Sequence, residues 1–126
     1  MTKQAKLYYL ASPYTHTNKK TRELRFNKVT KASIWLLLKK NIVSFSPIAY
    51  NHPMVKYELP TDWAFWKKYD TNFLQHSDGL IVFTLDGWKD SIGVQAEINI
   101  AKKLKLPIFY LSEDDIEKDS LPKGLH

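Results

Sequence analysis

Short apolar segments alternate with longer segments of helical periodicity along the chain, and this alternation constrains the fold most strongly. The apolar segments are typical of β-strands and cover residues 6–11, 42–45, 79–84 and 107–111. Apolar residues at intervals of three and four predict helices over 21–40, 62–76 and 91–105. Because strands joined through helices pair in parallel and are covered on both faces, we expect a small doubly wound, flavodoxin-like α/β fold with a parallel sheet of four to five strands.

A chain of 126 residues, 44% of them hydrophobic, is long enough for one hydrophobic core and too short for two. We therefore expect a single domain over residues 1–126. No apolar run approaches the ~20 residues that span a bilayer, and no signal peptide is evident, so we expect a cytoplasmic protein without membrane contact. The absence of cysteine excludes disulfides, thiolate metal sites and thiol nucleophiles.

The net charge of +6 favours anionic partners. However, the basic residues occur as dispersed lysine pairs on expected solvent-exposed faces, at 19–20, 39–40, 67–68 and 102–103. They form no basic stripe with interleaved aromatic residues, and no nucleic-acid-binding motif is present. We therefore expect a small anionic substrate rather than polymeric nucleic acid.

The segments that follow parallel strands meet at one edge of the sheet, where doubly wound folds bind their ligands. In this chain they are residues 12–14, the Pro- and aromatic-rich stretch 46–61, which we expect to be a loop, and residues 85–93. The start of the third helix belongs to the same edge. We expect the functional site there.

Two carboxylates, Asp70 and Glu97, occupy positions that helical periodicity assigns to buried faces. Glu97 lies four residues after Gly93 and four before Ala101, and Asp70 lies four residues before Leu74. Carboxylates are almost never fully buried unless something pairs with them. The pair therefore predicts either a functional site or internal ion pairs with Arg or Lys.

The start of the third helix offers a second candidate feature. Ser91 and Gly93 expose backbone N–H groups where the helix dipole favours an anion, although Ser91 is equally suited to simple N-capping. Glu97 lies about 9 Å further along the axis at ~1.5 Å per residue. A phosphate at the N-terminus would thus leave a sugar ring near Glu97, where a carboxylate can attack an anomeric carbon or stabilise an oxocarbenium-like transition state.

Several other residues have both a binding and a structural interpretation. Trp63 and Trp66 could stack a base or belong to the core, and Trp88 could close over a ligand. Arg25, one helical turn after Arg22, could clamp phosphate or pair with acids. The four histidines and the carboxylates lack metal-ligand spacing, so we expect no metal site. No nucleophile elbow, Walker loop or dinucleotide fingerprint is present.

The residues around the two carboxylates resemble one known family. The motifs, in chain order, are Tyr8-x-x-x-Ser12, Asp70-x-x-x-Leu74-x-x-x-Asp78 and Ser91-x-Gly93-Val94-x-x-Glu97-x-x-x-Ala101. Together they resemble the nucleoside 2-deoxyribosyltransferase superfamily, and the Ser-x-Gly-Val-x-x-Glu spacing is closest to its 2′-deoxynucleoside 5′-monophosphate N-glycosidases. The Ser-Pro-Ile, His-Pro and Asp-Trp-x-x-Trp segments resemble an uncharacterised bacterial and phage branch. The resemblance covers about residues 6–111.

This resemblance implies roles for particular residues. Glu97 matches the nucleophile that attacks C1′ and displaces the base. Asp70 matches the residue that contacts the sugar and assists protonation or positioning. Tyr8 matches a tyrosine that lies against the sugar and orients the glutamate. Ser91 matches a phosphate-binding serine of the nucleotide hydrolases, and Ser12 is an expected substrate contact. No cofactor is implied.

The chain also departs from the family pattern. The sequence Ala-Ser-Pro-Tyr at 11–14 replaces the Gly-rich phosphate turn of the nucleotide hydrolases, so a preference for monophosphates does not follow. The region after residue 111 lacks the later segment that transferases contribute to the partner subunit's site, which favours water over a second base as acceptor. Relatives complete their sites across a two-fold axis, which implies a homodimer.

We therefore expect an enzyme that cleaves the N-glycosidic bond of a nucleoside or its 5′-monophosphate, by hydrolysis or by deoxyribosyl transfer. The alternative is a nucleotide-sensing domain of the same fold without turnover. A third possibility is a structural module whose buried carboxylates are ion-paired.

Overall fold

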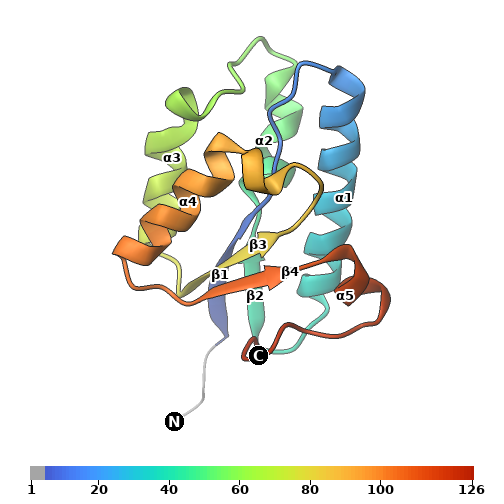
Figure 1. Cartoon of the computed structure of the whole chain (residues 1–126), viewed down its shortest axis with the longest axis vertical. Helices are drawn as coiled ribbons and strands as arrows, with labels where there is room; N and C mark the ends of the chain where they lie inside the picture. The colour runs from blue at the N-terminus through green and yellow to red at the C-terminus, as the bar shows by residue number, and fades with distance from the viewer. Residues whose placement is uncertain (1–4) are drawn as a thin grey trace.

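The computed structural model describes residues 5–126 (Figure 1). The strands are β1 (Lys6–Ala11), β2 (Ile42–Phe45), β3 (Gly79–Phe83) and β4 (Ile108–Leu111). The helices are α1 (Lys19–Leu37), α2 (Pro47–Val55), α3 (Trp63–Gln75), α4 (Ile92–Lys103) and α5 (Glu113–Glu117), with a 3₁₀ turn, η1 (Trp88–Asp90), before α4. Among the described residues, no helix is long and apolar enough to cross a lipid bilayer.

The four strands form one parallel sheet in the order β2-β1-β3-β4, which confirms the expected small doubly wound fold. The chain builds outward from β1 to β2 and then returns to the other side of β1 for β3 and β4. This reversal between β1 and β3 is the topological switch point, where folds of this strand order open a crevice at the carboxyl ends of their strands.

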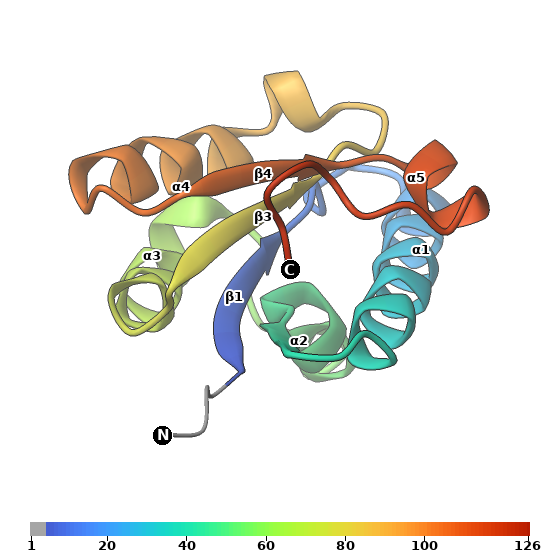
Figure 2. The same ribbon diagram turned by 90° about the horizontal axis from the view of Figure 1, so that it is seen from below.

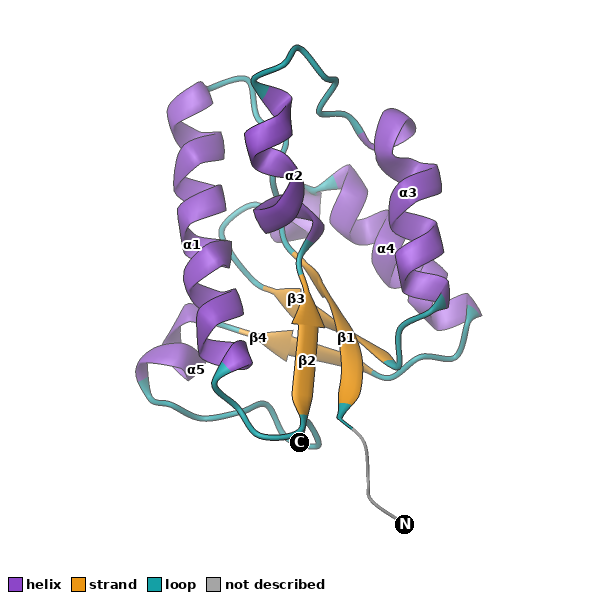
Figure 3. Ribbon diagram, turned by 180° about the vertical axis from the view of Figure 1, so that it is seen from behind, coloured by secondary structure: helices purple, strands orange, loops and turns teal. Residues whose placement is uncertain are grey.

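Helices cover the sheet on both faces, α1 and α2 on one and α3 and α4 on the other (Figures 2 and 3). The core is correspondingly divided into two clusters. Tyr8 and Leu10 of β1 pack with α1, whereas Tyr9 and Ala11 pack with α3 and α4. Because side chains alternate along a strand, successive residues of β1 contribute to opposite halves of the core.

The stretch 46–61 contains the helix α2, so the expectation of a loop there is wrong for its first half. The two prolines of this helix suggest a loop, but Pro47 is at its start, where a missing N–H costs nothing. Ser46 caps the helix by accepting a hydrogen bond from the Ala49 N–H at 3.1 Å. The short helix α5, capped by Ser112, was also not expected.

Candidate active site

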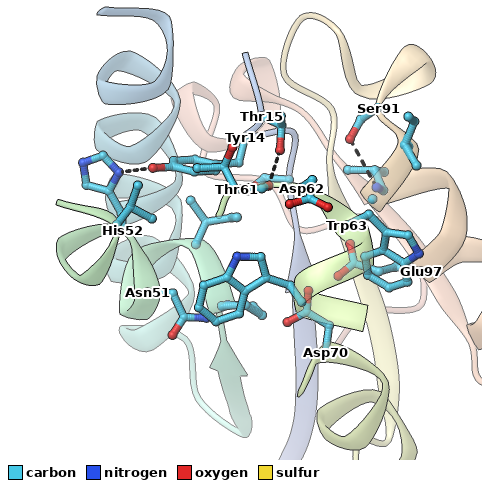
Figure 4. Close-up of a pocket in the computed structure, with 18 of the residues that line it drawn as sticks. Tyr14, Thr15, Asn51, His52, Thr61, Asp62, Trp63, Asp70, Ser91 and Glu97 are labelled. Carbon is cyan, nitrogen blue, oxygen red and sulfur yellow. Dashed lines mark hydrogen bonds between the residues drawn. The ribbon is translucent and has the colours of Figure 1, made fainter. Parts of the chain in front are cut away.

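A cavity of about 260 Å³ opens at the carboxyl ends of the strands, beside the switch point between β1 and β3 (Figure 4). Its walls come from the loop after β1, from α2 along its length, and from α3 and α4 with the segments that precede them. The structure thus brings the segments after β1, β2 and β3 together at the expected edge. The volume is close to the lower end of the ~300–1,000 Å³ that is typical of small-molecule sites.

Glu97 of α4 and Asp70 of α3 both line this cavity (Figure 4). Their side chains are almost completely buried, with residue exposures of 6% and 8%. Within residues 5–126, neither carboxyl group forms an ion pair with Lys, Arg or His. A structural module whose buried carboxylates are ion-paired would need such pairs. The described structure shows none for Glu97 or Asp70.

Tyr9 connects Glu97 to the sheet. Its hydroxyl, on a side chain that is 1% exposed, donates a hydrogen bond to Glu97 Oε2. The bond comes from the middle of β1, so the carboxyl group is held by a rigid element. A hydrogen-bond donor to the carboxylate stabilises the charged form of Glu97 and opposes the cost of its burial.

Burial dominates the electrostatics of the pair. Desolvation raises the pKa of Asp70 to about 7, and the Tyr9 hydroxyl opposes this rise. Desolvation also raises the pKa of Glu97 well above its usual range; the nearby Asp70 adds to the increase and Tyr9 again opposes it. Because two adjacent buried carboxylates repel each other, the pair favours a state with a proton retained near neutral pH.

Three buried polar atoms on the cavity wall have no hydrogen-bond partner in the described protein. They are Ser12 Oγ, Asn51 Oδ1 and Asp70 Oδ1. Buried polar groups in folded proteins nearly always have partners. Three such atoms around one cavity mean that the protein itself leaves several polar groups of this wall without partners.

Tyr8 does not lie at this site, so its expected role as the residue that orients Glu97 is wrong. Its ring packs edge-on against Phe109, with ring centroids 5.9 Å apart, on the face of the sheet covered by α1. Side chains along β1 point alternately to the two faces of the sheet. The adjacent Tyr9 therefore faces α3 and α4 and lies next to Glu97.

The expected contacts Ser12, Ser91, Gly93 and Trp63 all line the cavity. Ser91 caps α4 by accepting from the Val94 N–H at 3.2 Å, so its capping role is realised. Gly93 lies opposite Trp63, where an added Cβ would meet the indole at an ordinary contact distance of 3.8 Å.

Two other expected contacts, Trp88 and Arg25, lie outside the cavity lining. Trp88 packs against Tyr110, with ring centroids 5.6 Å apart. Arg25 donates to the backbone carbonyls of Thr15, at 3.1 Å, and Asp86, at 3.4 Å. In the structure, Arg25 therefore joins the loops after β1 and β3.

The cavity lining also contains residues that were not among the expected contacts. Tyr14 and His52 are hydrogen-bonded to each other at 2.6 Å, and Asn51 lies beside them on α2 (Figure 4). Asp62 and Asp90 contribute two further carboxylates near the starts of α3 and α4. The lining thus holds four acidic residues and, within residues 5–126, no Lys or Arg.

No group of three or more His, Asp or Glu side chains in the described part of the chain is placed to hold a metal ion. The cavity offers carboxyl, hydroxyl, imidazole and indole groups to a ligand.

Residues 6–113 match a family described as a domain of unknown function (DUF1937). The match covers both carboxylates, Tyr9 and every strand of the sheet. No curated protein matches the chain at a significant level.

Proposed function

The chain belongs to the DUF1937 family, and we propose that it cleaves the N-glycosidic bond of a nucleoside, with Glu97 and Asp70 as the catalytic pair. Hydrolysis is the first candidate reaction, and transfer of the sugar to a second base is the alternative outcome. The proposal depends on one observation above all: two buried carboxyl groups without a cationic partner line one cavity, and Tyr9 holds one of them.

This arrangement suits a reaction whose transition state is cationic. As a glycosidic bond breaks, positive charge develops on C1′ and the ring oxygen. A buried carboxylate that has no Lys or Arg to neutralise it stabilises that charge strongly, because little water screens the interaction. An internal ion pair would remove this effect, and neither Glu97 nor Asp70 has one in the described structure.

The two carboxyl groups can take different roles in one displacement reaction, Glu97 as the nucleophile and Asp70 as the acid. A Glu97 oxygen bonds to C1′ while the bond between C1′ and the base nitrogen breaks, and the electron pair of that bond leaves with the base. Asp70, with a pKa of about 7, donates its proton to the base. Water then attacks C1′, Glu97 leaves as a carboxylate, and the proton from water returns to Asp70.

Protonation decides which group takes which role. The reaction needs the charge on Glu97 and the proton on Asp70. The Tyr9 hydrogen bond to Glu97 Oε2 favours the charge on Glu97, against the burial and the Asp70 repulsion that raise its pKa. The pair then carries one negative charge and one proton, as a nucleophile and an acid require.

The charge of the cavity favours an unphosphorylated substrate. The starts of α2, α3 and α4 meet here, and their dipoles supply at most about half a positive charge each. Asp62 and Asp90, next to two of these helix starts, offset most of that charge, and the catalytic pair makes the cavity negative. A phosphate dianion would enter a cavity whose described lining contains no Lys or Arg. The indole groups of Trp63 and Trp66 offer apolar surface for the base.

A sensing domain without turnover is the second candidate. The raised pKa values of Asp70 and Glu97 favour it, since a pair that keeps a proton can hold a ligand by hydrogen bonds alone. Both candidates place the ligand in the same cavity, and they differ in whether the base is released.

The experiment is a chromatographic assay for free base. Wild type, Glu97→Gln and Asp70→Asn are incubated with deoxy- and ribonucleosides and their 5′-monophosphates, with and without an acceptor base. Glu117→Gln, on exposed α5, is the matched control. We expect wild type and the control to release base from nucleosides, and Glu97→Gln to release none. A new nucleoside formed with the acceptor would identify transfer. Binding without release by wild type would support the sensing domain.

A further inference from the structure

We propose that the Tyr14 hydroxyl, held by His52 and Glu23, is a hydrogen-bond acceptor that recognises an N–H or O–H group of the ligand. This inference rests on the proposed function in one respect: it takes the ligand of the cavity to be a nucleoside. It concerns the wall formed by the loop after β1 and by α2, across the cavity from Glu97 (Figure 4).

The three side chains form a continuous chain of hydrogen bonds. The Tyr14 hydroxyl lies 2.6 Å from His52 Nδ1, and His52 Nε2 lies 2.8 Å from Glu23 Oε1. The imidazole ring is stacked on Phe26, with ring centroids 4.2 Å apart and the planes inclined by 21°. Packing and hydrogen bonding therefore fix the position of His52 from two directions.

The chemistry of Glu23 and His52 decides which atom donates in each of the two hydrogen bonds. An ionised Glu23 can only accept, so His52 Nε2 must carry a proton. In the neutral imidazole, Nδ1 is then unprotonated and can only accept, so the Tyr14 hydroxyl must donate to it. The single proton of Tyr14 is thus committed to His52, and the remaining capacity of its oxygen is for accepting.

No other group of the described protein uses the Tyr14 oxygen. Burial raises the pKa of Tyr14; the positive charge of Arg22 on α1 opposes that rise, and Glu23 adds to it. Within the described residues, the bond to His52 is the only hydrogen bond of the Tyr14 hydroxyl, so the acceptor capacity of its oxygen is left for a ligand.

Tyr14 is placed to contact a ligand from this wall. Tyr14 and His52 both line the cavity, and Tyr14 is 8% exposed. Asn51, next to His52 on α2, lines the same wall and is 7% exposed. An acceptor on this side of the cavity favours ligands that carry neutral donors. The hydroxyl groups of a sugar and the amino or imino groups of a base are both of this kind.

The first test is the tautomer of His52. In ¹⁵N-labelled protein at pH 8, the imidazole shifts are expected to show a protonated Nε2 and an unprotonated Nδ1. Glu23→Gln keeps an acceptor oxygen and is expected to preserve this tautomer, whereas Glu23→Leu is expected to lose the preference. A protonated Nδ1 in wild type would overturn the inference, because Tyr14 would then be free to donate.

The second test pairs Tyr14→Phe with ligands that lack single donors. The parent is 2′-deoxyadenosine or thymidine, whichever wild type uses better. Its analogues lack the 3′-hydroxyl, the 5′-hydroxyl or the donor group of the base. Each is compared by kcat/KM if cleaved and by Kd if only bound. One neutral hydrogen bond corresponds to a loss of about three- to tenfold.

We expect Tyr14→Phe to lose that factor with the parent and to lose nothing further with the one analogue that lacks the recognised group. The identity of this analogue distinguishes a sugar hydroxyl from a base N–H. Equal losses with every ligand, or no loss with the parent, would overturn the inference while leaving the proposed function intact. If wild type neither binds nor cleaves any nucleoside, the proposed function and this inference fail together.

Discussion

The Tyr9 hydroxyl donates a hydrogen bond to Glu97 Oε2 from the centre of the sheet, linking β1 to α4 across the buried core. It is the only hydrogen bond to the Glu97 side chain within the described residues, and it opposes the rise in the Glu97 pKa that burial and Asp70 cause. The neighbouring Tyr8 faces the opposite side of the sheet and provides an internal comparison.

Removing this donor is expected to lower activity and to shift its pH dependence. Tyr9→Phe deprives ionised Glu97 of its hydrogen bond, so the pKa of Glu97 rises further and the rising limb of kcat/KM moves to higher pH. A hydrogen bond to a charged group contributes about 1.5–3 kcal/mol, or roughly a 10- to 150-fold loss in rate. Tyr8→Phe is the matched control and is expected to keep the wild-type pH dependence of kcat/KM. Equal effects of the two substitutions would contradict the role of Tyr9 as the donor to Glu97.

Asp70 is expected to make the protein less stable as the pH rises. Its pKa is about 7 in the folded protein, whereas an aspartate in water has a pKa of 3.8. Between these values the folded state binds more protons than the unfolded state, so the free energy of unfolding falls by at most about 1.4 kcal/mol per pH unit. Asp70→Asn is expected to be more stable than wild type at pH 8, and this difference in stability is expected to decrease towards pH 4.

Denaturant unfolding between pH 4 and pH 8 measures this difference, with exposed Asp86→Asn as control. An Asp70→Asn variant that is less stable than wild type at pH 8 would refute this prediction.

The role of Asp70 as the acid predicts a second pH effect. Activity is expected to decline above pH 7 as Asp70 loses its proton, and Asp70→Asn is expected to remove this limb while lowering kcat by about 10²- to 10⁴-fold. A 2-deoxyriboside with a nitrophenolate leaving group needs no protonation, so the variant should cleave it with a much smaller loss. An equal loss with both kinds of leaving group would show that Asp70 is not the acid.

The acidic residues at the helix starts are expected to exclude phosphate. The double variant Asp62→Asn and Asp90→Asn removes two negative charges from the cavity lining. Its kcat/KM for 5′-monophosphates is expected to rise several-fold relative to that for nucleosides, and the gain should shrink with added salt. Steady-state kinetics at two ionic strengths measures this ratio, with Asp114→Asn on α5 as the control. A ratio unchanged from wild type would mean that the lining charge does not select the substrate.

The sheet and its two covering layers could be predicted because they depend on local patterns. The apolar strands and the helical periodicity between them are visible in the sequence, and only a parallel sheet accommodates both. Asp70 and Glu97 could be placed on buried faces by the same periodicity. The helix α2 could not be predicted, since Pro47 and Pro53 suggest a loop and so hide the N-cap signal of Ser46.

Other features of the site depend on relations that no local pattern contains. Alternation requires Tyr8 and Tyr9 to face opposite sides, but only the packing of α4 decides which of them meets Glu97. The Glu23–His52–Tyr14 chain joins residues 29 and 38 positions apart. The net charge of +6 sums over the whole surface, so it could not reveal that four acidic residues line the cavity. The expectation of an anionic substrate stays a prediction. The homodimer implied by the resemblance stays a prediction.

Release of free base from 2′-deoxynucleosides by wild type and by Glu97→Ala tests the central claim most directly. Both proteins are first compared by circular dichroism and thermal unfolding, and the variant is expected to be folded because it loses only a buried acid. We predict steady release of one base by wild type and none by Glu97→Ala. Release at the wild-type rate by the folded variant would contradict the account, because the carboxyl group held by Tyr9 would then have no part in the reaction.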